Sequence, residues 1–133
     1  MAKEFEAANC QILGASVDSV HVHRKYTQTE RKDGGLGQMQ IPLLSDVNKE
    51  LARAYGCLIE DDSGDRGAAF RATYIIDKEG VLRQYSMNDL PIGRNAEEVL
   101  RLVKACAWAD EHGDVCPAAW KPGNATMKED HNA

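Results

Sequence analysis

The four cysteines are the residues of this sequence most able to do chemistry, because a thiolate is both a nucleophile and a metal ligand. Cys116 lies in the polar, turn-rich stretch 113–123, just beyond a segment with a strong helical pattern. We expect this thiol to be exposed and able to reach another molecule. Cys10, Cys57 and Cys106 lie in or beside apolar runs, so we expect them to be buried and inert. An ordinary surface cysteine without a function is the alternative for Cys116.

The cysteine and histidine spacings argue against a metal centre. No two cysteines form a Cys-x-x-Cys pair, which makes a zinc ribbon or a thioredoxin-type dithiol a poor fit. His21, His23 and His112 lack a second pair of ligands. The glycines of 34–37 lack the Gly-Lys-Ser/Thr ending of a phosphate-binding loop. We therefore expect neither a metal nor a cofactor.

Two arginines occupy positions from which a guanidinium can assist thiol chemistry. Arg71 lies in an apolar segment typical of a strand, and Arg94 lies where a loop meets a helix. A guanidinium at the rim of a sheet can lower a thiol pKa or hold a peroxide or carboxylate oxygen. A solvated sheet face is the alternative for both residues.

Composition limits the class of protein. The 133 residues are 43% hydrophobic and 28% charged, which indicates one soluble domain with a core of its own. A formal net charge of −5 argues against nucleic-acid binding. The first residues lack the apolar core of a secretory signal, and no apolar run approaches the length that spans a bilayer. We expect a cytoplasmic protein with free thiols.

The order of predicted elements is that of an α/β fold. Residues 2–8 favour helix, 10–17 form an apolar run typical of a buried strand, and 20–29 favour helix. A short apolar element at 41–44 precedes a helix that Asp46 caps and that ends near Tyr55, before Gly56. Further along we predict an exposed loop at 60–68, a hairpin of strands 70–76 and 81–87, and a helix that Asn95 begins. From 110 onward we predict loop and tail, and we expect one sheet covered by helices.

These segments, in this order, resemble the typical two-cysteine peroxiredoxins over nearly the whole chain. The matching stretches are 13–19 (LGASVDS), 34–37 (GGLG), 41–46 (IPLLSD), 70–71 (FR), 75–77 (IID), 88–94 (NDLPIGR) and 111–117 (EHGDVCP). The resemblance implies a thioredoxin-like fold. It also implies antioxidant reduction of hydrogen peroxide and organic hydroperoxides, with thioredoxin as the reductant.

The resemblance also implies roles for single residues. Cys116 matches the resolving cysteine, which attacks a sulfenic acid on a partner subunit to form an intersubunit disulfide. Arg71 matches the arginine that stabilises the peroxidatic thiolate, and Arg94 resembles a supporting arginine. The strand 81–87 matches the edge that pairs across the family's dimer, so we expect a homo-oligomer, either a dimer or a ring of dimers. Residues 1–110 would be a partial thioredoxin-like domain, and 111–133 a C-terminal segment that carries the resolving cysteine.

The sequence departs from the family pattern in ways that bear on activity. The Phe-x-x-x-Cys-Pro-Thr-Glu type of motif with the peroxidatic cysteine is absent, so we expect an N-terminally truncated fold that does not turn over peroxide alone. The loop 60–68 is longer than usual, and Ala72 stands where the family generally has glycine. The alternatives are a non-catalytic module that pairs with full-length subunits, or a thiol-disulfide or metal-binding protein unrelated to peroxide.

Overall fold

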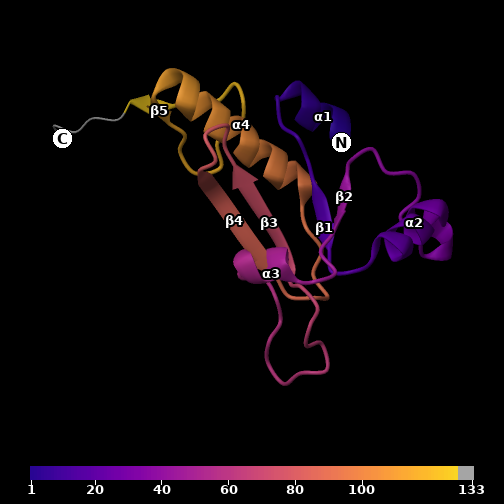
Figure 1. Ribbon diagram of the computed structural model, residues 1–133. Helices are drawn as coiled ribbons and strands as arrows, with labels where there is room; N and C mark the ends of the chain where they lie inside the picture. The colour runs from indigo at the N-terminus through magenta and orange to yellow at the C-terminus, as the bar shows by residue number, and fades with distance from the viewer. Residues whose placement is uncertain (129–133) are drawn as a thin grey trace.

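A β-hairpin and one long helix form the centre of the computed structural model, which describes residues 1–128 (Figure 1). The elements in chain order are α1 (Ala2–Ala7), β1 (Gly14–Ser16), α2 (Val20–Gln28), a 3-10 turn (Arg31–Asp33), β2 (Leu43–Ser45), α3 (Glu50–Ala54), β3 (Arg71–Ile76), β4 (Leu82–Asn88), α4 (Ala96–His112), β5 (Asp114–Val115) and β6 (Met127–Lys128). The predicted α/β order is confirmed.

The strands of the described residues form three two-stranded sheets, not the single sheet that we predicted. β1 and β2 are parallel, with Gly14 opposite Leu43, while β3 pairs with β4 and β5 with β6 in antiparallel ladders. Periodicity in a sequence shows which residues become strands, but it carries no information on which strands become neighbours. The expected single sheet is therefore wrong for residues 1–128.

The hairpin β3–β4 is confirmed with almost the predicted limits. Asp77 closes its turn, because one carboxylate oxygen accepts hydrogen bonds from the backbone N–H groups of Glu79 at 2.9 Å and Val81 at 3.0 Å. Gly80 supplies the left-handed conformation of this turn, with a φ of +81°. The register runs from Arg71 opposite Asn88 at one end to Ile76 opposite Leu82 at the other.

Helix α4 begins and ends where capping residues predict. The Asn95 side chain accepts hydrogen bonds from the N–H groups of Glu97 and Glu98, and Gly113 follows the helix with a φ of +66°. The helix lies along the hairpin in Figure 1, and the salt bridge from Arg83 of β4 to Asp110 of α4, at 2.8 Å, joins them. The helix extends to His112 and β5 follows, so the prediction of loop and tail from 110 onward is wrong.

The two shorter internal helices differ in how well their sequence signals predicted them. α2 begins after Ser19, whose hydroxyl accepts a hydrogen bond from the N–H of Val22, as a helix cap should. α3 is shorter than the predicted 46–55, because Lys49 takes a left-handed conformation and delays the start of the helix. Asp46 still satisfies its N-terminus, since its carboxylate accepts from the N–H groups of Leu51 and Ala52 at 3.0 and 2.7 Å.

The buried core is small for a chain of this length. Its apolar members are Phe5, Ala52, Cys57, Ile59, Ile75, Leu100 and Trp120. The run 10–17 is not the buried strand that we predicted: only Gly14–Ser16 is extended, and Leu13 is 54% exposed. β1 pairs only with β2 among the described residues, and none of its three residues is buried. No helix within 1–128 combines the length and apolar character that crossing a membrane requires.

Candidate functional site

The structure brings Arg71 and Arg94 together at one end of the hairpin. Arg71 opens β3 and donates through Nε to the backbone carbonyl of Leu90 at 3.3 Å, while Arg94 donates through Nε to the carbonyl of Ala72 at 3.0 Å. Burial, followed by the positive charge of Arg71, lowers the pKa of Arg94 below its usual value. The two guanidinium groups therefore lie close enough to repel each other.

The loop that carries Arg94 is fixed by the hairpin itself. Asn88, the last residue of β4, donates through its side-chain amide to the carbonyl of Gly93 at 2.9 Å. Within the described residues neither arginine forms a salt bridge, and both donate from Nε to backbone carbonyls. Two unneutralised guanidinium groups side by side are suited to hold an anionic or peroxidic oxygen.

Cys57 lies beside the arginine pair and Tyr74 lies beside Cys57, which the sequence did not indicate. Cys57 is buried, and its carbonyl accepts from the N–H of Phe70 at 2.8 Å, directly before Arg71. Burial, and next a hydrogen bond and charge from Cys57, raise the pKa of Tyr74 to about 12. The charge of a Cys57 thiolate would in turn stabilise the Arg94 cation. The residues next to Cys57 in the sequence give it no charged partner, but the fold places Arg94 near it.

Cys116 is less exposed than we predicted. Its thiol is half-buried, and its Sγ donates to the backbone carbonyl of Ala105 in α4 at 3.7 Å. The turn-rich composition around it predicted a solvated segment, but Trp120 anchors that segment and is only 2% exposed. Arg101 of α4 donates to the Trp120 carbonyl at 2.8 Å, and the Trp108 and Trp120 rings lie 5.8 Å apart.

Strands β5 and β6 complete this C-terminal segment. Asp114 accepts hydrogen bonds from the ammonium of Lys128 at 2.5 Å and from the hydroxyl of Thr126 at 2.8 Å. These hydrogen bonds hold the pKa of Asp114 below its usual value, and the bond from Lys128 has the largest effect. We name the stretch 114–128 the docked segment. Asp114 joins its two ends, and the carbonyl of Trp120 binds it to α4.

The structure does not bring Cys116 to the arginine pair. Arg94 precedes the first turn of α4, whereas Cys116 lies at the level of Ala105. At about 1.5 Å of rise per residue, these two levels of the helix are about 14 Å apart. The three predicted site residues therefore lie at two separate places: Arg71 and Arg94 form a pair, and Cys116 lies on the docked segment.

The remaining two cysteines are half-buried, not buried as we predicted. Burial raises the pKa of Cys10 and of Cys106. For Cys106 the guanidinium of Arg83 opposes that effect, while the negative charges of Asp110 and Cys116 add to it. The fold thus places Cys106 beside Cys116, a neighbour that the helical pattern alone could not indicate.

The histidines do not gather around a common point. His23 is buried in α2 and shares a hydrogen bond with the hydroxyl of Ser16, and His112 stacks on Trp108 with ring centroids 3.9 Å apart. No group of three histidine, cysteine, aspartate or glutamate side chains within 1–128 is arranged to hold a metal ion.

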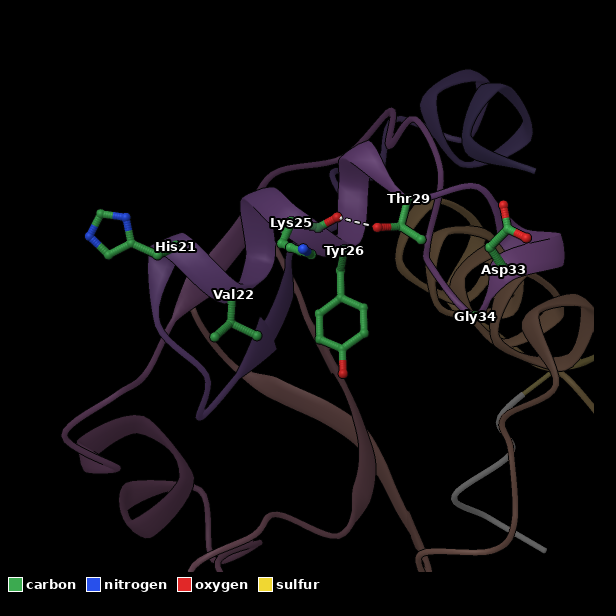
Figure 2. Close-up of a pocket in the computed structure, with 7 residues that line it drawn as sticks. All are labelled: His21, Val22, Lys25, Tyr26, Thr29, Asp33 and Gly34. Carbon is green, nitrogen blue, oxygen red and sulfur yellow. Dashed lines mark hydrogen bonds between the residues drawn. The ribbon is translucent and has the colours of Figure 1, made fainter.

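A shallow, mostly apolar pocket lies on α2, away from every predicted site residue. Its lining comprises His21, Val22, Lys25, Tyr26, Thr29, Asp33 and Gly34. Figure 2 shows Val22 and Tyr26 extending to the same side of the helix, while His21 extends away from them. The Thr29 hydroxyl donates to the carbonyl of Lys25 at 2.8 Å, so it is already satisfied. No cysteine lines the pocket, so it offers no thiol chemistry.

Two family models match this chain. The one described as the AhpC/TSA family matches residues 1–85, and the one described as the C-terminal domain of 1-Cys peroxiredoxin matches residues 108–133. The second match includes Cys116 and the docked segment.

Individual proteins match over almost the whole chain. It is 52% identical to Peroxiredoxin-1 of Gallus gallus, over 97% of this chain and 63% of that protein. It is 51% identical to Thioredoxin peroxidase of Trypanosoma brucei rhodesiense, over 98% of this chain and 63% of that protein. The crystal structure of reduced Plasmodium vivax 2-Cys peroxiredoxin matches with a TM-score of 0.89 and 36% identity, covering 95% of this chain and 63% of that one. The chain thus spans under two thirds of these relatives' length, and the thioredoxin-like fold of the typical two-cysteine peroxiredoxins is confirmed for the part it shares.

Proposed function

Since the chain belongs to the AhpC/TSA family, we propose that it takes part in the thioredoxin-dependent reduction of hydroperoxides and that Cys116 is its resolving cysteine. A peroxidatic thiolate on a partner subunit attacks the hydroperoxide and becomes a sulfenic acid, which releases an alcohol or water. Cys116 then attacks the sulfenic sulfur. A disulfide forms between the subunits, and the departing hydroxide leaves as water after it takes a proton.

The observation that carries this proposal is the separation of Cys116 from the arginine pair. A thiol that resolved a centre next to Arg71 and Arg94 of its own chain would have to lie near them. Cys116 instead lies at the level of Ala105, about 14 Å further along α4 by the rise of the helix. This separation favours attack on another subunit over attack within the chain.

In the proposed reaction, Arg71 and Arg94 stabilise the thiolate and bind the peroxide. Both donate through Nε to backbone carbonyls, and within 1–128 neither is neutralised by a carboxylate. Their remaining donors can stabilise a thiolate and orient a peroxide oxygen. The name of the trypanosome relative supports thioredoxin as the reductant that returns the disulfide to thiols by exchange.

A coupled assay tests the activity of the chain itself. None of the cysteines is followed by the Pro-Thr pair of the peroxidatic motif, so we expect the purified 133-residue chain to show no sustained peroxide consumption with thioredoxin and its reductase. A complete two-cysteine peroxiredoxin in the same assay is the positive control. Sustained turnover by the chain would contradict the proposal and would mean that one of its own thiols acts as the peroxidatic one.

A non-catalytic pairing module is the second candidate, and the outer edge of β4 favours it. Among the described residues β4 pairs only with β3, which leaves its other edge free to extend the sheet of a second subunit. Exposed apolar side chains accompany this edge: Leu82 is 46% exposed, Tyr85 63% and Met87 40%. Burial of such side chains would stabilise a dimer.

Sedimentation or size-exclusion measurements with a complete peroxiredoxin test the pairing. The variant Tyr85→Lys should weaken the association, because it places a charge on the buried face of the pair. Val47→Lys is the matched control, since Val47 is 55% exposed but lies outside the hairpin. Equal association of both variants and the unmodified chain would exclude β4 as the pairing edge.

A further inference from the structure

Gly113 reverses the chain after α4 and returns it along the helix to Cys106. Its φ of +66° is a left-handed conformation that ends the helix. From Cys106 to the end of α4 the helix rises by about 9 Å, at about 1.5 Å per residue. The extended residues from Asp114 to Cys116 return by about 10 Å, at about 3.3 Å per residue. Cys116 therefore comes level with Cys106, although the two lie ten residues apart in the sequence.

The contacts of the two thiols agree with this geometry. Cys116 Sγ donates to the carbonyl of Ala105 at 3.7 Å, and the next residue of the helix is Cys106. The two side chains are near enough for the charge on Cys116 to act on Cys106. Both are half-buried free thiols, so each is partly accessible to a small oxidant.

The pKa of Cys106 is raised overall, and one nearby charge favours its thiolate. Arg83 lies close enough to stabilise it, and Arg83 is itself held by Asp110, at 2.8 Å, and Asp77, at 3.4 Å. Burial and the two carboxylates oppose ionisation, so among residues 1–128 the Arg83 guanidinium is the one cationic group that acts in favour of the thiolate. A thiolate at Cys106 is the nucleophile that a sulfenic acid on Cys116 would meet first.

We propose that Cys106 and Cys116 form a dithiol pair that a hydroperoxide closes to a disulfide within one chain. The Cys116 thiolate attacks the peroxide oxygen, which gives a sulfenic acid and releases an alcohol, or water from hydrogen peroxide. The Cys106 thiolate attacks the sulfenic sulfur, the S–S bond forms, and hydroxide leaves and takes a proton to become water. The two thiols supply both electrons that reduce the hydroperoxide.

The pair regulates Cys116, a consequence that rests on the function proposed above. Once Cys116 is bonded to Cys106, it cannot resolve a sulfenic acid on a partner subunit. A small dithiol reductant opens the disulfide by exchange and restores the free thiol, whereas the two half-buried sulfurs are shielded from a protein reductant such as thioredoxin, so the pair adds no sustained turnover to the thioredoxin assay. The chain would thus withdraw its resolving cysteine under oxidising conditions and return it when reductant is available.

Mass spectrometry of the full chain tests this inference. The reduced protein is treated with hydrogen peroxide at high dilution, its remaining thiols are blocked with N-ethylmaleimide, and the monomer is digested without reductant. We expect a peptide pair joined through Cys106 and Cys116, and an intact monomer that has lost two hydrogen atoms and two sites of alkylation. Failure to find this linkage in the monomer would overturn the proposal.

Three variants make the result specific. Cys10→Ser is the matched control, since Cys10 is also half-buried with a pKa raised by burial, and it should retain the linkage. Cys106→Ser and Cys106→Ala should both lose it and leave Cys116 as an unresolved sulfenic acid, one oxygen heavier than the thiol and trapped by dimedone; circular dichroism verifies that each variant is folded. Formation of an equivalent monomeric disulfide in either Cys106 variant would contradict the pairing. Cross-linking of Cys116 to a complete peroxiredoxin, without any Cys106–Cys116 linkage, would reject this inference alone.

Discussion

Arg94 donates through Nε to the backbone carbonyl of Ala72, 3.0 Å away, and so ties the loop before α4 to the first strand of the hairpin. Arg71, one residue before Ala72, is fixed in a similar way on the carbonyl of Leu90. Because both side chains are held by neutral carbonyls, each keeps its full positive charge for a ligand. The arrangement sets two cations side by side at the cost of their mutual repulsion, which an anionic partner would relieve.

Replacement of Gly113 by alanine should destabilise the chain at the turn that carries Cys116. A φ of +66° is strained for a residue with a Cβ atom, so we expect Gly113→Ala to lower the free energy of unfolding by about 1 kcal/mol. No heavy atom lies within 4 Å of the added Cβ, so the effect is conformational and not steric. Urea denaturation measures it. Gly93→Ala, which also meets open space but lacks a positive φ, should have a smaller effect; equal losses would contradict this account.

Acid should release the docked segment through Asp114. Hydrogen bonds from Lys128 and Thr126 lower the folded-state pKa of Asp114 below the ordinary 3.8. The carboxylate therefore stabilises the fold above that ordinary pKa, and the contribution is lost as the pH falls through the folded-state pKa. Tryptophan emission should report the release of Trp120 in an acid titration. Asp114→Asn should remove this step, whereas Asp62→Asn, on an exposed loop, should leave it unchanged; an unaltered titration in Asp114→Asn would argue against the assignment.

Alkali should weaken the fold through Tyr74. Burial, together with Cys57, raises its pKa from 10.0 to about 12. The folded state thus holds the phenol proton more tightly than the unfolded state, and the associated stability is complete below about pH 10 and lost as the pH rises through 12. Ultraviolet titration of tyrosinate should show one late step that disappears in Tyr74→Phe. That variant should also cost about 1 kcal/mol, because it removes the hydrogen bond to the carbonyl of Tyr55 at 2.7 Å. Persistence of the late step in Tyr74→Phe would refute the assignment.

Removal of the Arg83 guanidinium should make Cys106 less reactive. Arg83 opposes the effect of burial on the Cys106 pKa, so Arg83→Met should raise that pKa further and slow alkylation by iodoacetamide at mildly alkaline pH. The free energy of unfolding should fall by about 1 kcal/mol or less, since the Arg83–Asp110 bridge is partly exposed. Arg66→Met removes a more exposed and remote bridge to Asp62 by the same change of side chain and is the control. Faster or unchanged alkylation of Cys106 in Arg83→Met would show that the guanidinium does not act on the thiol.

The sequence predicted those elements whose signals are local. The Asn95 cap and apolar spacing located α4, and Asp77 and Gly80 located the hairpin turn, because each signal involves residues within a few positions of one another. The positions of Arg71 and Arg94 suggested that each could assist thiol chemistry, and the family resemblance implied a role for each. The strand pairing was missed, because which strands lie side by side depends on contacts between distant residues.

The environment of the cysteines depended on such distant contacts too. Cys116 looked exposed because its neighbours are polar, yet Trp120 and Arg101 fasten its segment to α4. Cys106 looked like a core residue because it follows the apolar stripe of α4, yet it is half-buried beside Arg83 and Cys116. In both cases the burial of the thiol depends on residues distant in the sequence, which a local pattern does not show.

A complementation assay tests the central claim most directly. A complete two-cysteine peroxiredoxin whose own resolving cysteine is replaced by serine is mixed with this chain, and peroxide consumption is followed with thioredoxin and its reductase. If Cys116 resolves sulfenic acids on a partner subunit, the chain should restore turnover and the Cys116→Ser variant should not. No restoration by the unmodified chain, or equal restoration by Cys116→Ser, would contradict the account.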